Sequence, residues 1–89
     1  LLYVESRNDQ TFFHLSEESL PSRERISKIA ERLPAGFLRI HRSFIINPSA
    51  AISINSQEVQ MPGAVLSVSR SYRPQLNEYL QGQSQPKEA

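Results

Sequence analysis

The stretch FLRIHRSFII, residues 37–46, begins with the alternation of apolar and polar side chains that is typical of a half-buried β-strand. Leu38 and Ile40 fall on one face of this strand. If the alternation continued, Arg42 would join the same apolar face, next to Phe44. An unpaired guanidinium is costly to bury among apolar side chains. Either the strand ends before Arg42 and releases it, or Arg42 is held in the apolar row for a purpose.

A helical pattern precedes this stretch. Four apolar residues have the spacing i, i+3, i+4, i+7 that marks one face of a helix, namely Ile26, Ile29, Ala30 and Leu33. Ser22 is the expected N-cap, and the sequence PAG at 34–36 ends the pattern. We therefore predict a helix of about three turns whose apolar stripe rests on a sheet.

The remaining apolar segments have β character. LLYVES and TFFHLS predict a hairpin with a loop around residues 7–10, longer than two residues because no Asn-Gly or Asp-Gly pair marks a tight turn. AISIN predicts a further strand, and EVQM and AVLSVS predict a hairpin across Pro62 and Gly63. A second helix is predicted from about Ser71, with an apolar face of Tyr72, Leu76, Tyr79 and Leu80.

These patterns predict a mainly β domain with short antiparallel sheets and one or two short helices. The chain length of 89 residues suits one small domain, which we place at residues 1–80. Residues 81–89, QGQSQPKEA, have nothing to bury and are expected to form a disordered tail. LLYVE has β character from its first residue, so we expect the chain to be a fragment that lacks an upstream strand.

The amino-acid composition argues against several classes of functional site. The chain has no cysteine, two histidines and three glycines, so neither a thiolate metal site nor a glycine-rich phosphate loop is expected. A Ser–His pair at His41 and Ser43 lacks an orienting acid nearby in the sequence. We therefore expect no enzyme, no metal, no cofactor and no small-molecule substrate. The net charge is only +1, but eight of the ten cationic residues are arginine, which suits bidentate recognition of phosphate or guanine.

Polar residues where strands meet loops are the remaining candidates. Arg70 closes the last strand, and Arg73 lies close to a predicted helix N-terminus, a place that favours phosphate. His41 is expected to bond nearby backbone at the strand break, and Arg39 to be solvated or paired with a glutamate. The first hairpin loop adds side chains that can bond to phosphate or base edges, namely Arg7, Asn8, Gln10 and Thr11.

Three segments together resemble the LytTR family of bacterial DNA-binding domains. FLRIHRSFIIN at 37–47 carries the pattern F-x-R-x-H-R-S-[FY]-x-x-N, LSVSRSY follows at 66–72, and VES stands at 4–6. The similarity runs from Leu1 to about Leu80. It implies a mostly β domain, usually the C-terminal output of a two-component response regulator, that reads DNA with loop residues and not with a recognition helix.

The resemblance implies three DNA-contacting segments, which match Asn8 to Thr11, Arg42 and Arg70 in this chain. The strand would end at His41, so that Arg42 leaves the apolar row and enters a DNA groove. Arg7 and Arg73 would bind phosphate. Domains of this kind act in pairs on repeated half-sites of double-stranded DNA, which implies a dimer on DNA.

The resemblance also implies a receiver or sensor domain upstream and a location in the cytoplasm. Two positions depart from the family pattern. Ser67 stands where the family often has proline, and Asp9 brings a carboxylate close to phosphate unless it accepts from cytosine N4. The near-neutral charge and Asp9 favour an alternative, a LytTR-fold domain that regulates or binds proteins without DNA. A steep loss of affinity with salt would distinguish a DNA-binding domain from this alternative.

Overall fold

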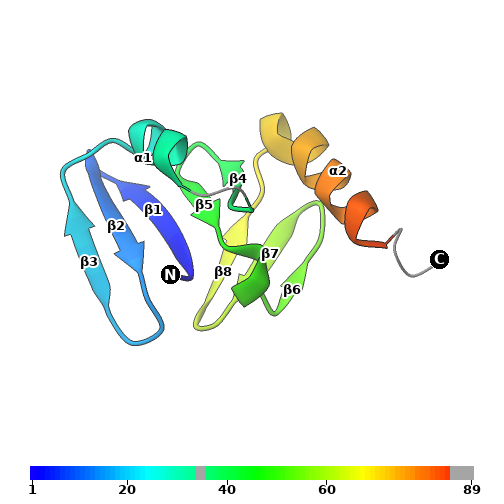
Figure 1. Ribbon diagram of the computed structural model, residues 1–89, viewed down its shortest axis with the longest axis horizontal. Coiled ribbons are helices and arrows are strands. Elements are labelled where there is room, and N and C mark those ends of the chain that lie inside the picture. The colour runs from blue at the N-terminus through cyan, green and yellow to red at the C-terminus, as the bar shows by residue number, and fades with distance from the viewer. Residues whose placement is uncertain (34–35, 85–89) are drawn as a thin grey trace.

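The computed structural model describes residues 1–33 and 36–84, and this part of the chain forms two antiparallel sheets and two α-helices (Figure 1). The five-stranded sheet has the order β3-β2-β1-β5-β4, and the three-stranded sheet has the order β6-β7-β8. The predicted fold class is therefore confirmed. The elements are β1 (Tyr3–Arg7), β2 (Gln10–His14), β3 (Ser19–Ser22), α1 (Ile26–Arg32), β4 (Leu38–His41), β5 (Phe44–Ile46), the 3-10 helix η1 (Pro48–Ala50), β6 (Ser53–Ile54), β7 (Glu58–Met61), β8 (Ala64–Ser67), the 3-10 helix η2 (Arg70–Tyr72) and α2 (Arg73–Ser84).

The first hairpin turns within two residues. Arg7 pairs with Gln10 across the strands, so Asn8 and Asp9 alone form the turn between β1 and β2. Their φ angles are 51° and 66°, the left-handed values that a type I′ turn requires at both central positions. The prediction of a longer loop is wrong, because Asn and Asp tolerate this conformation and replace the expected Asn-Gly pair.

A third strand and a shorter helix replace the long helix predicted from Ser22. Ser22 pairs with Thr11 at the end of β3, and its Oγ accepts a hydrogen bond from the backbone N–H of Glu24 at 3.2 Å. α1 begins only after Arg25, which makes no side-chain cap, and has 7 residues. The predicted N-cap at Ser22 is therefore wrong. The sequence SLPS of β3 has no β-branched residue to predict a strand, and Pro21 is tolerated because β3 lies at the edge of the sheet.

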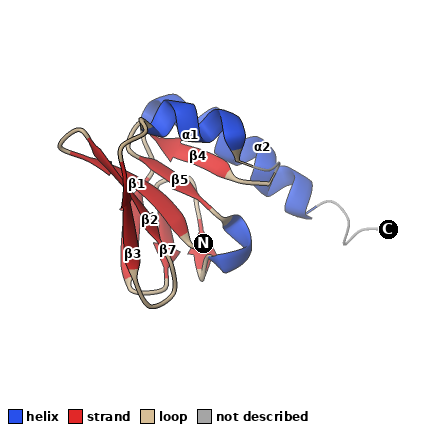
Figure 2. Ribbon diagram, turned by 60° about the vertical axis from the view of Figure 1, so that its left-hand side comes forward, coloured by secondary structure: helices blue, strands red, loops and turns tan. Residues whose placement is uncertain are grey.

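Apolar residues are buried on both faces of the five-stranded sheet. On one face, Val4 and Ile45 pack with Ile26 and Ile29 of α1, as the predicted apolar stripe requires. The other face contributes to a larger cluster shared with the three-stranded sheet and α2, which contains Tyr3, Ile40, Ile46, Val59, Met61, Leu66, Val68 and Leu76. Burial on both faces explains why β5 is apolar at every position and why β1 begins with two consecutive buried apolar residues, Tyr3 and Val4. Both helices lie in the upper part of the view in Figures 1 and 2, although they pack against opposite faces of the five-stranded sheet.

The three-stranded sheet contains the predicted second hairpin. β7 and β8 pair across Pro62 and Gly63, and the φ of 83° at Gly63 suits the third position of a type II turn. Leu66 and Val68 are buried, whereas Val65 is exposed. The prediction of this hairpin is confirmed.

The predicted C-terminal helix is confirmed as α2, which follows η2. Pro74 lies in its first turn, where a missing N–H breaks no helical hydrogen bond. α2 continues to Ser84, so residues 81–84 are helical and the predicted tail does not begin at 81. The rest of that tail and residues 34–35 of the predicted helix stop lie outside the described residues. No helix in the described part of the chain is long and apolar enough to cross a membrane.

Candidate nucleic-acid interface

Arg42 lies in the turn between β4 and β5. β4 ends at His41, β5 begins at Phe44, and the pairing register shifts between Arg39 and His41, as at a β-bulge. The shift and the turn take Arg42 out of the apolar row, and the residue is exposed. The predicted end of the strand at His41 is confirmed, and the cost of burying a guanidinium is avoided.

The ring of His41 closes this turn. The backbone N–H of Ser43 donates to His41 Nδ1 at 3.0 Å, and the ring centre lies 5.2 Å from that of Phe44. The predicted structural role of His41 is confirmed. The ring bonds to the backbone of Ser43 and not to its hydroxyl, so the pair does not form an activated nucleophile. In the described part of the chain, no three His, Asp or Glu side chains are placed to hold a metal ion.

Arg39 binds the carbonyl groups of the same turn. Its Nη2 donates to the Arg42 carbonyl at 2.8 Å, and its Nε donates to the His41 carbonyl at 3.3 Å. Its guanidinium carbon lies 5.7 Å from the centre of the Tyr72 ring, in the element that begins with Arg70. The expectation that Arg39 is solvated or paired with a glutamate is wrong, because the turn offers two carbonyls that the guanidinium fork can satisfy together.

Two backbone hydrogen bonds bring three separate segments to one end of the five-stranded sheet. The N–H of Ser6 donates to the Ser43 carbonyl at 2.8 Å, which places the β4–β5 turn beside the end of β1. The N–H of Ser69 donates to the Ile40 carbonyl at 2.8 Å, which places the start of η2 beside β4. The end of β1 and the start of α2 both lie on the upper side of Figure 1.

We call four exposed candidate residues at this end the loop row, namely Asn8, Gln10, Arg42 and Arg70, and we leave out Arg7 because it is paired with Glu5. The order of the strands places the β1–β2 turn first, the β4–β5 turn next and η2 last. With neighbouring strands about 4.8 Å apart, the row spans roughly 15–20 Å. This is about half of the helical repeat of B-DNA, so the row can follow one face of a duplex.

Two of the predicted DNA contacts, Thr11 and Arg73, are not fully exposed to solvent. Thr11 is only 2% exposed, and its Oγ1 donates to the Glu24 carbonyl at 2.6 Å. Thr11 therefore does not present its side chain at the surface as the predicted DNA contact requires, because the alternation of β2 turns this side chain toward the loop that precedes α1. Arg73 is half-buried, and its Nε is enclosed without a hydrogen-bond partner among the described residues.

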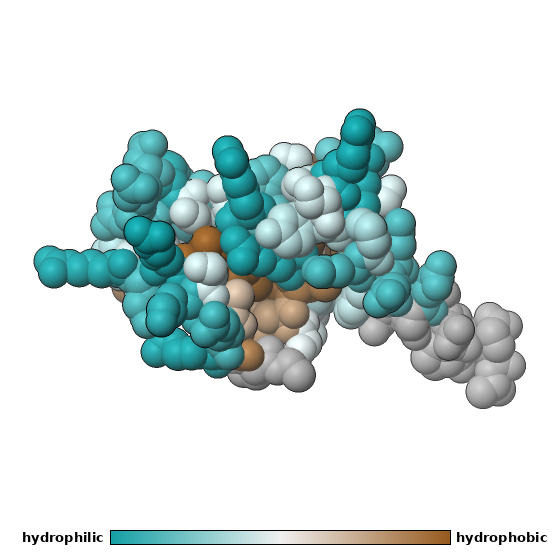
Figure 3. All heavy atoms as spheres, turned by 90° about the horizontal axis from the view of Figure 1, so that it is seen from above, coloured by the Kyte–Doolittle hydropathy of each residue, from teal (hydrophilic) through white to brown (hydrophobic). Residues whose placement is uncertain are grey.

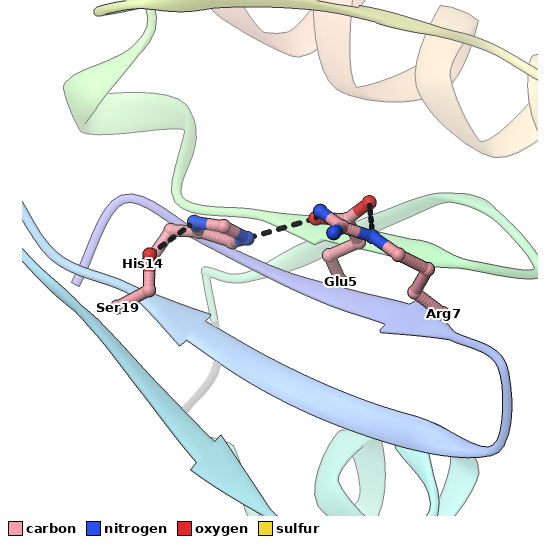
Figure 4. Close-up of polar contacts among 4 residues, drawn as sticks. All are labelled: Glu5, Arg7, His14 and Ser19. Atoms are coloured by element: carbon pink, nitrogen blue, oxygen red, sulfur yellow. Dashed lines mark hydrogen bonds and ion pairs between the residues drawn. The ribbon is translucent and has the colours of Figure 1, made fainter.

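Arg7 is exposed, but its guanidinium is already paired. Its Nη2 and Nε donate to the two carboxylate oxygens of Glu5 at 3.0 and 3.3 Å, and its guanidinium carbon lies 5.4 Å from the centre of the Phe12 ring. Figure 4 shows that Glu5 also meets His14, whose Nε2 lies 2.9 Å from Oε1. Ser19 Oγ lies 2.9 Å from the other ring nitrogen of His14. This network connects β1, β2 and β3.

The network also favours the charged form of Glu5. Burial of the carboxyl raises its pKa, but the hydrogen bonds and charges of Arg7 and His14 outweigh burial and hold the pKa of Glu5 below its usual value. The same pair raises the pKa of Arg7. Glu5 therefore stays ionised near neutral pH and competes with any phosphate for Arg7.

A cleft of about 410 Å³ opens beside the β1–β2 turn. Its lining consists of Ser6, Asp9, Thr11, Arg23, Arg25 and Ile26. The two arginines are not among the predicted contacts, because a helix beginning at Ser22 would place the sequence SRER in its first turn and not in a loop. Figure 3, the view from above, shows that hydrophilic side chains dominate the side of the molecule on which the helices lie.

Comparisons with known proteins agree with this fold. A family model described as the LytTr DNA-binding domain matches residues 1–81. One similar solved structure is the LytTr DNA-binding domain of a Bacillus cereus protein that is assigned as a methyl-accepting/DNA response regulator. It is 26% identical, has a TM-score of 0.82, and the match covers 89% of this chain and 79% of that chain. A search of curated proteins finds no match. Because the family model spans almost the whole chain, the protein belongs to the LytTR family of DNA-binding domains.

Proposed function

We propose that this domain binds double-stranded DNA sequence-specifically through the loop row, as the output domain of a bacterial response regulator that controls transcription. The family match and the similar Bacillus cereus domain support this function. The observation that carries the proposal is the pair of backbone hydrogen bonds that aligns the three segments of the loop row. This alignment gives segments far apart in the sequence a common direction toward a single duplex.

Arg42 and Arg70 are proposed to read bases. Both residues are exposed, and neither guanidinium has a hydrogen-bond partner in the described part of the chain. An arginine in the major groove can donate two parallel hydrogen bonds to O6 and N7 of guanine. Asn8 and Gln10 carry amides that can bond to adenine in a similar bidentate way. The loop row therefore combines both of the commonest side-chain types for direct base recognition.

Arg7 and Arg73 are proposed to bind phosphate. Glu5 occupies two of the five N–H donors of Arg7, which leaves three for a phosphate oxygen. Arg73 is half-buried, so we expect it to contribute less than Arg7.

We further propose that two copies bind repeated half-sites. One loop row spans about half of a helical repeat, so one domain contacts only a short site. A second copy placed about one helical turn away would meet the same face of the duplex and extend the recognised sequence.

The test is selection from a randomised duplex pool at low salt, with sequencing of the bound fraction, for the wild type, Arg42→Ala and Arg70→Ala. Lys28→Ala is the matched control, because Lys28 is exposed on α1 and lies outside the loop row. We expect the wild type and the control to enrich paired short repeats. Each arginine variant should lose preference at one position within the repeat. A wild-type protein that enriches no sequence would reject the proposal.

Protein binding without DNA is the second candidate, and one observation favours it. Asp9 places an exposed carboxylate in the β1–β2 turn, where it would repel phosphate. A salt titration separates the two functions. Affinity for DNA should fall steeply as counterions compete, whereas affinity at an apolar protein interface should change little.

A further inference from the structure

The loop between β3 and α1 carries two exposed arginines next to the loop row. Arg23 and Arg25 line the cleft beside the β1–β2 turn, together with Ser6 and Asp9. The cleft lies on the α1 face of the sheet, because α1 itself contributes to the lining. Arg7 belongs to the opposite face, since it alternates with Ser6 along β1. Arginines therefore flank the β1–β2 turn on both faces of the sheet.

The backbone that carries Arg23 and Arg25 is held at the residue between them. Thr11 Oγ1 donates to the Glu24 carbonyl at 2.6 Å, and Ser22 Oγ accepts from the Glu24 N–H at 3.2 Å. Thr11 is buried, so its hydrogen bond is shielded from water. The two arginines thus extend from a fixed position in the loop.

Neither arginine is neutralised in the part of the chain that the structure describes. Glu24 lies between them in the sequence but pairs with Arg32 instead. Asp9 lines the same cleft but makes no ion pair with either of them. Arg7 differs, because Glu5 already holds its guanidinium. The cleft therefore has two free positive charges and one opposing carboxylate.

We propose that Arg23 and Arg25 bind a backbone phosphate of the DNA strand that passes the β1–β2 turn. This inference rests on the proposed DNA binding and adds a phosphate site on the α1 face. A phosphodiester matches the cleft, because it carries one negative charge and two oxygens that accept from guanidinium N–H groups. A phosphate held here would add affinity for any sequence, because phosphate contacts carry no sequence information, and Asn8 and Gln10 would still read the bases.

Salt dependence of binding tests the proposal. We would measure fluorescence anisotropy with a selected duplex for Arg23→Gln, Arg25→Gln and the double variant, with Lys28→Gln as a control of equal charge change. Loss of the phosphate contact in the double variant should lower the slope of log K against log salt by about 0.9, and each single variant should lower it by less. The advantage of the wild type over the double variant should then shrink by about 3.5-fold between roughly 50 and 200 mM salt. Lys28→Gln should keep the wild-type slope, and sequence preference should not change in any variant.

Neutral methylphosphonate groups placed singly in the duplex locate the contact. The wild type should lose affinity when the phosphate beside the β1–β2 turn is replaced, and the double variant should be insensitive to that replacement. Both proteins should respond alike to replacements elsewhere. Asp9→Asn should strengthen binding of the unmodified duplex, because it removes the opposing carboxylate from the cleft.

The outcomes separate this inference from the proposed function. A double variant that matches Lys28→Gln in affinity, slope and methylphosphonate pattern would overturn the phosphate site while leaving DNA binding in place. A double variant that loses sequence preference would also overturn it, since base reading would then involve the cleft. A wild-type protein that binds no duplex would overturn both proposals.

Discussion

The two turns of the loop row are both two residues long, but they are held in different ways. Asn8 and Asp9 form their turn by adopting positive φ, which few residue types tolerate. The β4–β5 turn instead depends on Arg39 and His41, two side chains outside the turn that bond to its backbone. The first turn therefore restricts its own sequence. The second turn does not depend on the Arg42 side chain, because hydrogen bonds from neighbouring residues maintain the shape of the turn.

Removal of the Arg39 side chain, which donates to two carbonyls at the β4–β5 turn, should have the largest effect on stability. Arg39→Ala removes the guanidinium that donates to the carbonyls of His41 and Arg42. Hydrogen bonds from charged groups contribute about 1.5–3 kcal/mol, so we expect the free energy of unfolding to fall by about 2 kcal/mol. Urea denaturation followed by circular dichroism measures this change. Arg39→Lys keeps the charge without the planar fork and should be intermediate. An unchanged stability in Arg39→Ala would show that the Arg39 hydrogen bonds are not required to hold the turn.

Removal of the Arg42 side chain should affect binding and leave the fold unchanged. The residue is exposed, and Arg39 bonds only to its backbone carbonyl, which alanine retains. Arg42→Ala should therefore change stability by less than about 0.5 kcal/mol. Its affinity for a selected duplex should fall by about 1–3 kcal/mol, with relaxed preference at one position. Anisotropy and urea denaturation of the same preparation check both parts, and a stability loss as large as that of Arg39→Ala would contradict them.

A β-branched residue should distinguish the two turns directly. Asp9→Val places a branched side chain at a φ of 66°, which should cost about 1–2 kcal/mol of stability. Ser43→Val is the matched control, because Ser43 does not have a positive φ and its hydrogen bonds involve backbone atoms. Asp9→Gly should be at least as stable as the wild type, since glycine accepts the left-handed conformation without strain. Equal losses in Asp9→Val and Ser43→Val would mean that the two turns are held alike.

The pH dependence of stability should show the smallest effect. The pKa of Glu5 lies below its usual value of 4.5, so the unfolded chain binds a proton more readily than the folded one. The contribution of Glu5 is fully present above its unfolded pKa and is lost as pH falls through its folded pKa. Solvent screening of this partly exposed pair should keep the contribution below about 1 kcal/mol. Urea midpoints of the wild type and Glu5→Gln should converge as the pH falls below the usual glutamate pKa of 4.5 and through the lower folded-state pKa, and parallel curves would exclude this role for Glu5.

Segments with a clear local pattern could be predicted from the sequence. The apolar stripe of α1, the Pro62–Gly63 turn and the end of β4 at His41 each depend on residues close together in the chain. β3 could not be predicted, because SLPS has no alternation and becomes a strand only by pairing with β2. Ser22 was predicted to be an N-cap but ends a strand, because a serine is compatible with both places and only the pairing of β3 with β2 decides between them.

Motifs and periodicity are local properties, so they were enough to assign the family, the mainly β class and the loops that carry Arg42 and Arg70. The accessibility and pairing of the polar side chains instead depend on the tertiary structure. It buries Thr11, pairs Arg7 with Glu5 and leaves Arg23 and Arg25 open beside the β1–β2 turn. The physical reason is that the accessibility and charge pairing of a side chain depend on strands and loops that come together from distant parts of the chain.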